Sequence, residues 1–297
     1  MSGLTAASAR IWRRIGVHAR AALLRGLSRR DLRVILADVA RVRAMAMTEV
    51  ELMASWREDP FVSPSASDPR RLLATQARLW QALPAEFTPL ELSPLTALGS
   101  VTKLSGTGQN RVISSMRGSE SVYDPVHPLA LEASRRRRSG HTRVHLAACH
   151  HIAQAWDSPN EPRHETRFGA VSSAPEGGSY VSELALLGLH LGFWAHLLPA
   201  LSPTARVEVV SWDPVVRTRI EESGITGHEC ITWGTDGPTW RHPYMVAGFR
   251  IVTGEDDVLG DGGLVPWTQM LTGNRKDRCV VSGISVDRLS ASPEVSG

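Results

Sequence analysis

Two glycine-containing segments near the C-terminal end carry residue types that suit nucleotide chemistry. The first is GDGG at residues 260–263, and the second is SGISVDRL at residues 282–289. Glycine has no side chain, so the backbone at such positions can approach a nucleotide closely. An always-charged guanidinium at the start of a helix can clamp a polyphosphate. The segments therefore predict ATP contacts, with an ordinary strand-to-helix turn as the alternative. The residues concerned are Gly262, Gly263, Gly283, Asp287 and Arg288.

A second group of chemically capable residues lies on one predicted strand. It consists of His145, Cys149, His150 and His151. Strand alternation places the first, second and fourth of these on one face, and histidine and cysteine both bind metals. No acidic residue is spaced to complete a site, so packing within the strand is favoured and no metal site is predicted. A serine nucleophile elbow is not indicated either, since the sequence contains no G-x-S-x-G.

The composition is that of an enzyme-sized globular protein. The chain has 297 residues, of which 42% are hydrophobic, and a net charge of +3. Its three cysteines are widely spaced and form no C-x-x-C pair, so we expect them to be reduced core residues. We expect no apolar run to approach the roughly 20 residues that cross a bilayer, and no signal peptide is recognisable. These features predict a cytoplasmic protein without membrane contact.

Positive charge is concentrated in two places. Ten arginines fall within the first 43 residues, and four more follow one another at residues 135–138. A basic helical arm can bind RNA phosphates. Arginines on a solvated helix face, or near a helix C-terminus where they complement the helix dipole, are the favoured interpretation.

Residues 1–83 predict a helical N-terminal region. Apolar residues recur with helical spacing around residues 11–23 and again around residues 32–42. Ser28 followed by Asp31, and Thr48 followed by Glu51, are typical helix-capping pairs. Asp68 before Pro69 predicts the start of a further helix. Residues 59–68 are rich in proline and serine and predict a loop.

From residue 84 to residue 290, predicted strands and helices alternate without a strict βαβ repeat. This order favours an α+β fold with a mixed, largely antiparallel sheet backed by helices. The proline-rich stretch 86–98 suits an edge or interface strand. Strand character is predicted for residues 100–104, 111–116, 142–148, 166–172, 205–210, 244–252 and 279–282. Helix character is predicted for residues 128–137, 180–198, 214–222 and those after 286. The tail, 291–297, is expected to be disordered.

This order of segments resembles the catalytic core of class II aminoacyl-tRNA synthetases, in the branch of histidyl-tRNA synthetase and the ATP phosphoribosyltransferase regulatory subunit. The stretch EFTPLELSP at 86–94 is similar to motif 1, and residues 145–154 and 163–171 are similar to the two strands of motif 2. Residues 112–125 resemble the R-P-E/D-x-T substrate segment, and YMVAGF at 244–249 resembles the Y-Y-x-G substrate strand. The segments 260–263 and 282–289 resemble motif 3. The match runs from about residue 84 to residue 289.

The resemblance implies a set of site residues. For catalysis it implies Arg288, Gln154 and Arg167. Arg167, like Arg143 and Arg163, is a candidate to replace an arginine that the family has in motif 2 and that this chain lacks. For substrate binding it implies Glu120, Arg117, Asp124 and Tyr244, with Glu120 receiving a ligand ammonium or, alternatively, pairing with Arg117. Trp267 follows the glycine-rich segment 260–263, which is predicted to form a turn, and is therefore expected near a ligand. The implied cofactors are ATP and Mg²⁺, the latter bridging phosphates.

The sequence departs from the family at places that matter for chemistry. Where motif 2 has F-R-x-E, this chain reads HIAQ at residues 151–154, so the arginine that stabilises the α-phosphate is absent, and an amide cannot supply the charge of a guanidinium. No segment corresponds to an anticodon-binding domain.

Two functions follow. The favoured one is an enzyme that activates an amino acid or related carboxylic acid as an acyl-adenylate and transfers it to a small-molecule or carrier-protein acceptor. The other is an inactive paralogue that serves as a regulatory or ligand-binding subunit of a partner enzyme. A homodimer is expected in both cases, and tRNA is the less favoured partner.

Overall fold

A computed structural model describes residues 6–155, 162–235, 244–254 and 257–291. The chain forms two compact units. The first contains residues up to Ser63 together with Ser114–Ser119, and the second contains Pro64–Ile113 and the residues from Glu120 onward. The predicted disordered tail lies outside the described residues from position 292.

The first unit is helical. Its elements are α1 (Ala6–Ile15), α2 (Val17–Ala21), a π-helical turn (Ala22–Gly26), α3 (Arg29–Ala46) and α4 (Glu49–Glu58). The predicted caps are confirmed: the Ser28 hydroxyl accepts the Asp31 amide proton at 3.1 Å, and Thr48 and Glu51 form a reciprocal capping box. None of the residues from α2 to α4 is buried. Their helicity therefore owes more to caps and propensity than to a core of their own.

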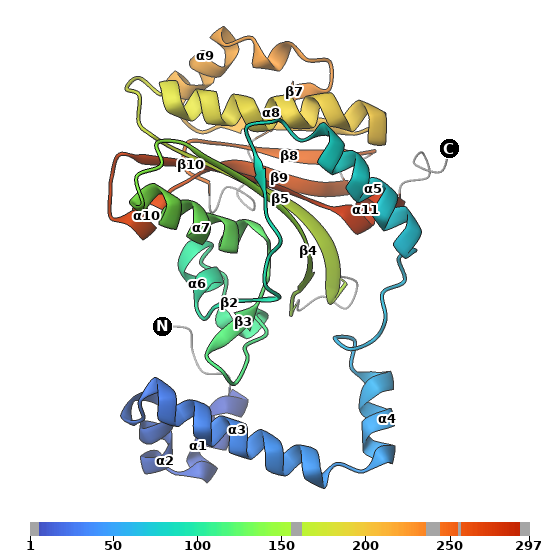
Figure 1. Ribbon diagram of the computed structural model, residues 1–297, viewed down its shortest axis with the longest axis vertical. Helices are drawn as coiled ribbons and strands as arrows, with labels where there is room; N and C mark the ends of the chain where they lie inside the picture. Colours follow the sequence, from blue (N-terminus) through green and yellow to red (C-terminus); the bar gives the residue numbers. More distant parts are fainter. Residues whose placement is uncertain (1–5, 156–161, 236–243, 255–256, 292–297) are drawn as a thin grey trace. The chain divides into compact units, whose positions relative to one another are not determined.

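The second unit is built on an eight-stranded sheet with the order β1-β4-β5-β10-β9-β8-β6-β7 (Figure 1). Neighbouring strands are antiparallel except for the outermost pairs, β1 with β4 and β6 with β7. The prediction of a mixed, largely antiparallel sheet is therefore confirmed. The strands are β1 (Thr88–Pro89), β4 (Val144–Ala153), β5 (His164–Pro175), β6 (Arg206–Ser211), β7 (Ile231–Trp233), β8 (Ala247–Thr253), β9 (Asp257–Val265) and β10 (Asp277–Ser285).

Helices cover both faces of this sheet (Figure 1). On one face lie α5 (Pro69–Ala82), α8 (Val181–Leu201), α9 (Pro214–Glu222) and α11 (Val286–Ala291). On the other face lie α6 (Ser100–Leu104), α7 (Val126–Arg138) and α10 (Trp267–Thr272). A separate two-stranded sheet joins β2 (Leu95–Ala97) to β3 (Ser119–Ser121). The central strands are thus buried on both sides, and a site can form only where a helix layer leaves room.

The glycine run at 260–263 is not a turn, contrary to the expectation from sequence. It lies inside β9, where Gly262 pairs with Phe249 of β8 and with Ser282 of β10. A side chain at Gly262 would place its Cβ atom 2.4 Å from the Phe249 ring and 2.7 Å from the Ser282 Cβ. At Gly260 the Cβ would lie 2.1 Å from the Gly283 carbonyl oxygen. These glycines allow strands and side chains to approach closely within the sheet.

Two predicted strands were wrong. Residues 100–104 form the helix α6, because the carboxylate of Glu120 accepts the amide protons of Gly99 and Val101 at 2.8 and 3.1 Å and so caps the helix. Residues 111–116 contain no strand; a 3-10 turn, Gln109–Arg111, enters this segment. The strand β7 and the helix α10 were not predicted from the sequence. In contrast, β1 is an edge strand of the main sheet, as its prolines predicted.

The expectation that no apolar stretch could span a bilayer was wrong on length and composition. The helix α8 has 21 residues with a mean hydropathy of 1.6, enough to cross a membrane by those criteria alone. It packs against β5, β6, β9 and β10, and its apolar residues belong to the core cluster of the sheet. The hydropathy of α8 is therefore explained by its place as a core helix.

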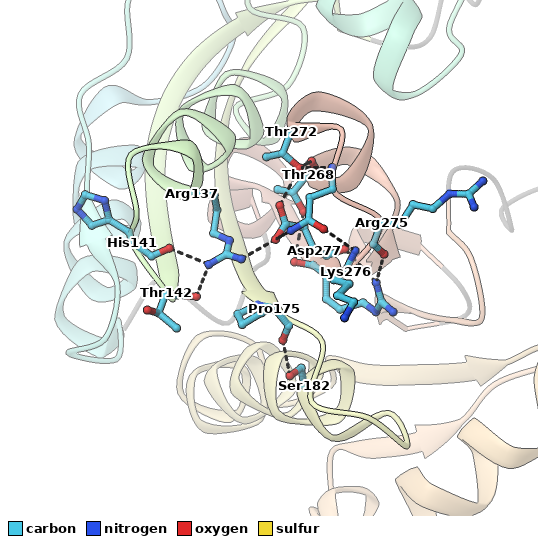
Figure 2. Close-up of polar contacts among 12 residues, drawn as sticks. Arg137, His141, Thr142, Pro175, Ser182, Thr268, Thr272, Arg275, Lys276 and Asp277 are labelled. Carbon is cyan, nitrogen blue, oxygen red and sulfur yellow. Dashed lines mark hydrogen bonds and ion pairs between the residues drawn. The ribbon is translucent and has the colours of Figure 1, made fainter.

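The arginines at the C-terminus of α7 hold the helix to the sheet and to α10. Arg137 donates to Asp277 at 2.5 Å, and to the carbonyl oxygens of His141 and Thr142 at 2.7 and 2.5 Å (Figure 2). Asp277 also accepts the hydroxyl proton of Thr272 at 2.7 Å (Figure 2). Arg137 and Asp277 are almost completely buried. This arrangement fits the predicted role of the arginines as a charged helix end. Arg137, one of the four, makes its contacts in the interior of the fold.

Candidate functional site

A small pocket of about 130 Å³ lies on the face of the sheet that α6, α7 and α10 cover. Its floor comes from β9 and β10, and its walls come from the segment leading into α7, the start of α10 and the residues just before β8. The lining residues are Ser105, Thr107, Tyr123, Asp124, Val126, His127, Tyr244, Asp261, Trp267, Val281, Ser282 and Gly283.

The first charged group of the pocket is Asp124, which pairs with Arg167 of β5. The carboxylate lies 3.2 Å from the Arg167 Nε, in a geometry that makes an ion pair without an aligned hydrogen bond. Its other oxygen accepts the Val126 amide proton at 3.0 Å, at the first turn of α7. Arg167 also lies 3.4 Å from Glu165 on its own strand. Burial lowers the pKa of Arg167, but Asp124, Glu165 and Asp261 outweigh burial and raise it, so the guanidinium stays charged.

The second charged group is Asp261 of β9, which accepts the phenolic proton of Tyr244 at 2.7 Å. Burial raises the pKa of this carboxyl group, and nearby Asp124 raises it further, whereas Arg167 and the Tyr244 hydrogen bond lower it. Burial and the adjacent Asp261 also raise the pKa of Tyr244, so the phenol remains protonated. Asp124 and Asp261 therefore form an acidic corner of the pocket, and burial disfavours the ionised form of Asp261.

A stacked aromatic pair forms the apolar wall. The rings of His127 and Trp267 lie 5.2 Å apart with an interplanar angle of 29°. Both side chains are buried, and neither the two His127 ring nitrogens nor the Trp267 indole nitrogen has a hydrogen-bond partner among the described residues. Burial lowers the pKa of His127, so its ring is neutral. This wall offers a ligand a flat, uncharged surface.

Several residues predicted for the site come together here. Asp124, Tyr244, Trp267 and Gly283 line the pocket, and Arg167 pairs with the first of them. The predicted residue Gly263 lies in the neighbouring strand, where a Cβ atom would lie 2.7 Å from the Tyr244 ring. Gly263 thus leaves room for the ring of Tyr244, which forms part of the pocket wall.

Other predicted residues lie elsewhere or are engaged in the fold. Glu120 is buried and, besides capping α6, accepts a proton from Gln109 at 2.9 Å. Gln154 is buried and donates to the Tyr123 carbonyl oxygen at 2.7 Å. Arg117 is exposed and belongs to the first unit.

The predicted phosphate-binding end of motif 3 lies at the junction of β10 and α11. Asp287 accepts protons from the Ser67 hydroxyl at 2.5 Å and from the Thr166 amide at 2.7 Å. Arg288 lies 3.5 Å from Asp257 and donates to the Val258 carbonyl oxygen at 3.2 Å. These partners belong to β5, β9 and the segment before α5, so both side chains help to join the helix to the sheet.

The histidine and cysteine group of β4 is explained by packing. His145 shares a hydrogen bond of 2.8 Å with Ser172, and His151 shares one of 3.0 Å with His164. Within the described parts of the chain, no three histidine, cysteine, aspartate or glutamate side chains are arranged to hold a metal ion. Most of the predicted motif 2 loop, from residue 156 to 161, lies outside the described residues.

Asp261, His127 and Tyr123 also line the pocket but were not predicted from the sequence. Asp261 stands within the glycine run that was singled out, and His127 follows the predicted Asp124 by three positions. Either was recognisable as a polar residue beside a predicted site residue. What the sequence did not show is that β9 pairs with β10 so that Asp261 lies opposite Gly283.

Comparison with solved structures confirms the fold class. The chain is similar to a crystal structure from Bacillus halodurans described as an ATP phosphoribosyltransferase regulatory subunit/histidyl-tRNA synthetase. The TM-score is 0.61 at 10% identity, covering 77% of this chain and 82% of that one.

Two further structures agree with this result. A histidine–tRNA ligase subunit from Alicyclobacillus acidocaldarius gives a TM-score of 0.57 at 13% identity, covering 78% of this chain and 95% of that one. The apo histidyl-tRNA synthetase of S. aureus gives 0.57 at 10% identity, covering 77% and 66%. No family model and no curated protein sequence matches the chain.

The protein thus has a class II synthetase-like fold, as the order of its motifs predicted. At such low identities the comparison establishes the fold alone. The function has to be argued from the pocket.

Proposed function

We propose that this protein is a class II synthetase paralogue that does not catalyse adenylation, but binds a small amine-bearing molecule of amino-acid size and acts as a ligand-binding or regulatory subunit. The observation that carries this proposal is the acidic pocket formed by Asp124, Asp261 and Tyr244 beside the wall of His127 and Trp267. The charge, size and shape of this pocket each favour such a ligand.

The charge of the pocket favours a cation. Three carboxyl groups, of Asp124, Glu165 and Asp261, surround the single guanidinium of Arg167. A buried carboxylate without a full counter-charge is costly, and an ammonium group placed beside it offsets that cost. Asp261 is the natural receptor, because Arg167 is shared with two other carboxyl groups, and Arg250, which lies opposite Asp261 in the sheet, pairs with Glu208.

The size of the pocket favours a small ligand. Its volume of about 130 Å³ is well below the roughly 300–1,000 Å³ of pockets that enclose drug-sized molecules. A free amino acid or a comparable amine is of a suitable size, whereas a complete nucleoside triphosphate is not. The flat wall of His127 and Trp267 further suits a planar or apolar side group on the ligand.

The residues at the positions of the family's phosphate contacts are poorly suited to bind a triphosphate. The motif 2 arginine is absent from residues 151–154, and the side-chain amide of Gln154 in that stretch donates to the Tyr123 carbonyl oxygen. Asp287 uses both carboxylate oxygens within the fold, and Arg288 is held by Asp257 and Val258. We therefore derive no catalytic step through ATP or Mg²⁺.

A regulatory role is supported by the kind of protein that shares the fold. One structural neighbour is described as a regulatory subunit of ATP phosphoribosyltransferase. By analogy, we propose that ligand binding in this pocket is communicated to a partner enzyme. The identity of that enzyme does not follow from the fold.

Calorimetry with free amino acids and small amines tests the proposal. We expect one class of amine to bind, and Asp261→Asn to weaken its binding by roughly 10- to 100-fold, the usual effect of losing a charge-assisted hydrogen bond of about 1.5–3 kcal/mol. Asp257→Asn is the matched control, because Asp257 is an exposed aspartate on the same strand. Its affinity should equal that of the wild type.

The second candidate is the adenylating enzyme, which the strand-to-helix position of Arg288 favours. Exchange of pyrophosphate into ATP that depends on one acid, and that Arg288→Ala abolishes, would establish adenylation and overturn the non-catalytic proposal. Binding of an amine without exchange would support the proposal.

A further inference from the structure

The helix α3 carries an apolar stripe that is exposed to solvent. Ile35, Val39 and Val42 are 46%, 47% and 54% exposed and follow one another at spacings of four and three residues, which places them on one side of the helix. No residue of this 18-residue helix is buried. A helix of this length is only marginally stable without packing, so a covered stripe would stabilise it.

The stripe belongs to a longer heptad pattern. Leu32, Ile35, Val39, Val42 and Ala46 are separated by three, four, three and four residues. This is the a/d spacing of a coiled-coil seam, with Leu32, Val39 and Ala46 at a and the other two at d. Spacing of this kind fits another helix with the same repeat.

The charges beside the seam indicate which helix that is. Asp38 occupies a g position and Arg43 an e position, five residues later. In a parallel pair of helices, a g residue of one faces the e residue five positions further along the other. Two copies of α3 side by side would therefore bring Asp38 of each helix to Arg43 of its partner, giving two symmetric ion pairs. Asp38 now pairs with Arg41 of its own helix at 2.6 Å, with both side chains largely exposed.

We infer that α3 pairs in parallel with α3 of a second copy of this chain, and that the protein is a homodimer through this helix. The two-fold axis runs along the pair, so each a residue meets its own counterpart. An RNA fits the stripe less well, because Ile35, Val39 and Val42 are apolar and offer no contact to a phosphate group.

Sedimentation of the full-length protein tests the interface. Val39→Glu places a charge at the centre of the seam twice per dimer, and we expect it to raise the dimer dissociation constant roughly 100-fold or more. Val34→Glu is the matched control, since Val34 is 62% exposed on the same helix but lies at a c position, away from the seam. That variant should remain dimeric, and near-ultraviolet circular dichroism should show that the sheet unit stays folded in both variants.

Charge exchange and cross-linking test the orientation. Asp38→Arg and Arg43→Asp should each weaken the dimer about fivefold, and the double variant should restore it. Ala46→Cys should form a disulfide between copies, because parallel pairing places residue 46 beside residue 46 of the other helix. The wild type, with Cys149, Cys230 and Cys279, provides the background for this reaction.

Three outcomes would overturn the inference. One is a monomer at tens of micromolar protein, and a second is a dimer that Val39→Glu leaves intact, which would place the interface elsewhere, for example at the edge segment 87–94. The third is rapid cross-linking between residues 32 and 46 in a mixture of Leu32→Cys and Ala46→Cys, without cross-linking of Ala46→Cys to itself. That pattern would show antiparallel pairing.

Discussion

His190 should make this protein sensitive to mild acid. It lies in α8, is almost fully buried, and shares hydrogen bonds with Ser282 at 2.7 Å through Nδ1 and with Ser172 at 2.9 Å through Nε2. Burial, and to a smaller extent the neighbouring His145, lower its pKa to about 3. In the unfolded chain the ordinary value of about 6.5 applies.

The sign and size of the effect follow from linkage. Below pH 6.5 the unfolded state binds a proton that the folded state does not, so stability is fully present above that pH and is lost as the pH falls toward 3. The pKa difference between about 6.5 and about 3 is worth about 5 kcal/mol at most. Between pH 7 and pH 5, His190 alone should remove about 2 kcal/mol.

The assay is urea unfolding at pH 7 and pH 5, comparing the wild type with His190→Gln. The variant loses the titrating ring, so its free energy of unfolding should fall about 2 kcal/mol less between these pH values. His196→Gln, at an exposed position of the same helix, controls for the loss of a histidine. Equal pH dependence in the wild type and in His190→Gln would refute the reasoning, as would an NMR titration showing His190 protonated near pH 6.

Three further predictions concern stability, measured by urea unfolding. Arg137→Met should cost about 3–5 kcal/mol because it leaves a buried carboxylate unpaired, whereas Arg135→Met, which breaks a largely exposed pair, should cost less than about 1 kcal/mol. Glu120→Gln should cost roughly 1–3 kcal/mol, since a neutral amide caps α6 less well, and should leave amine binding unchanged if the carboxylate only caps the helix. Asp261→Asn should stabilise the ligand-free protein at pH 7. Burial raises the pKa of the Asp261 carboxyl group, so stability is lost as the pH rises from the ordinary pKa of an aspartate through the raised one. A neutral amide does not ionise and removes this loss.

The parts of the fold that local chemistry decides were predictable from the sequence. Ser28, Thr48 and Asp68 cap helices at the predicted positions because a side-chain oxygen reaches an amide only two or three residues away. The segment at residues 100–104 was not predictable in this way. Its β-branched residues favour a strand, but the carboxylate of Glu120, about twenty residues further on, caps it as a helix.

The candidate site was predictable in part for a similar reason. Asp124 and Tyr244 were predicted because each stands in a segment resembling a family motif, and Trp267 because it follows the glycine-rich segment. Asp261 and His127 complete the pocket only through strand register and helix packing, since Asp261 pairs across the sheet with Gly283 and the His127 ring stacks on Trp267. The pairing register of the strands depends on the whole sheet, so it cannot be predicted from any single segment.

The glycines of the motif 3 region do not distinguish an enzyme from a binding protein. Gly260 and Gly262 are required by close packing within the sheet, so a chain that keeps this fold must keep them whether or not a nucleotide binds. The fold does not require charged residues at every position where they occur, so they say more about function than these glycines do. The stretch that resembles motif 2 lacks the arginine that phosphate chemistry needs, whereas Asp261 is a buried carboxyl group whose pKa burial raises, so its negative charge costs stability. A carboxylate in that position is stabilised by a cationic partner and not by a phosphate, and for this reason we prefer the amine-binding proposal.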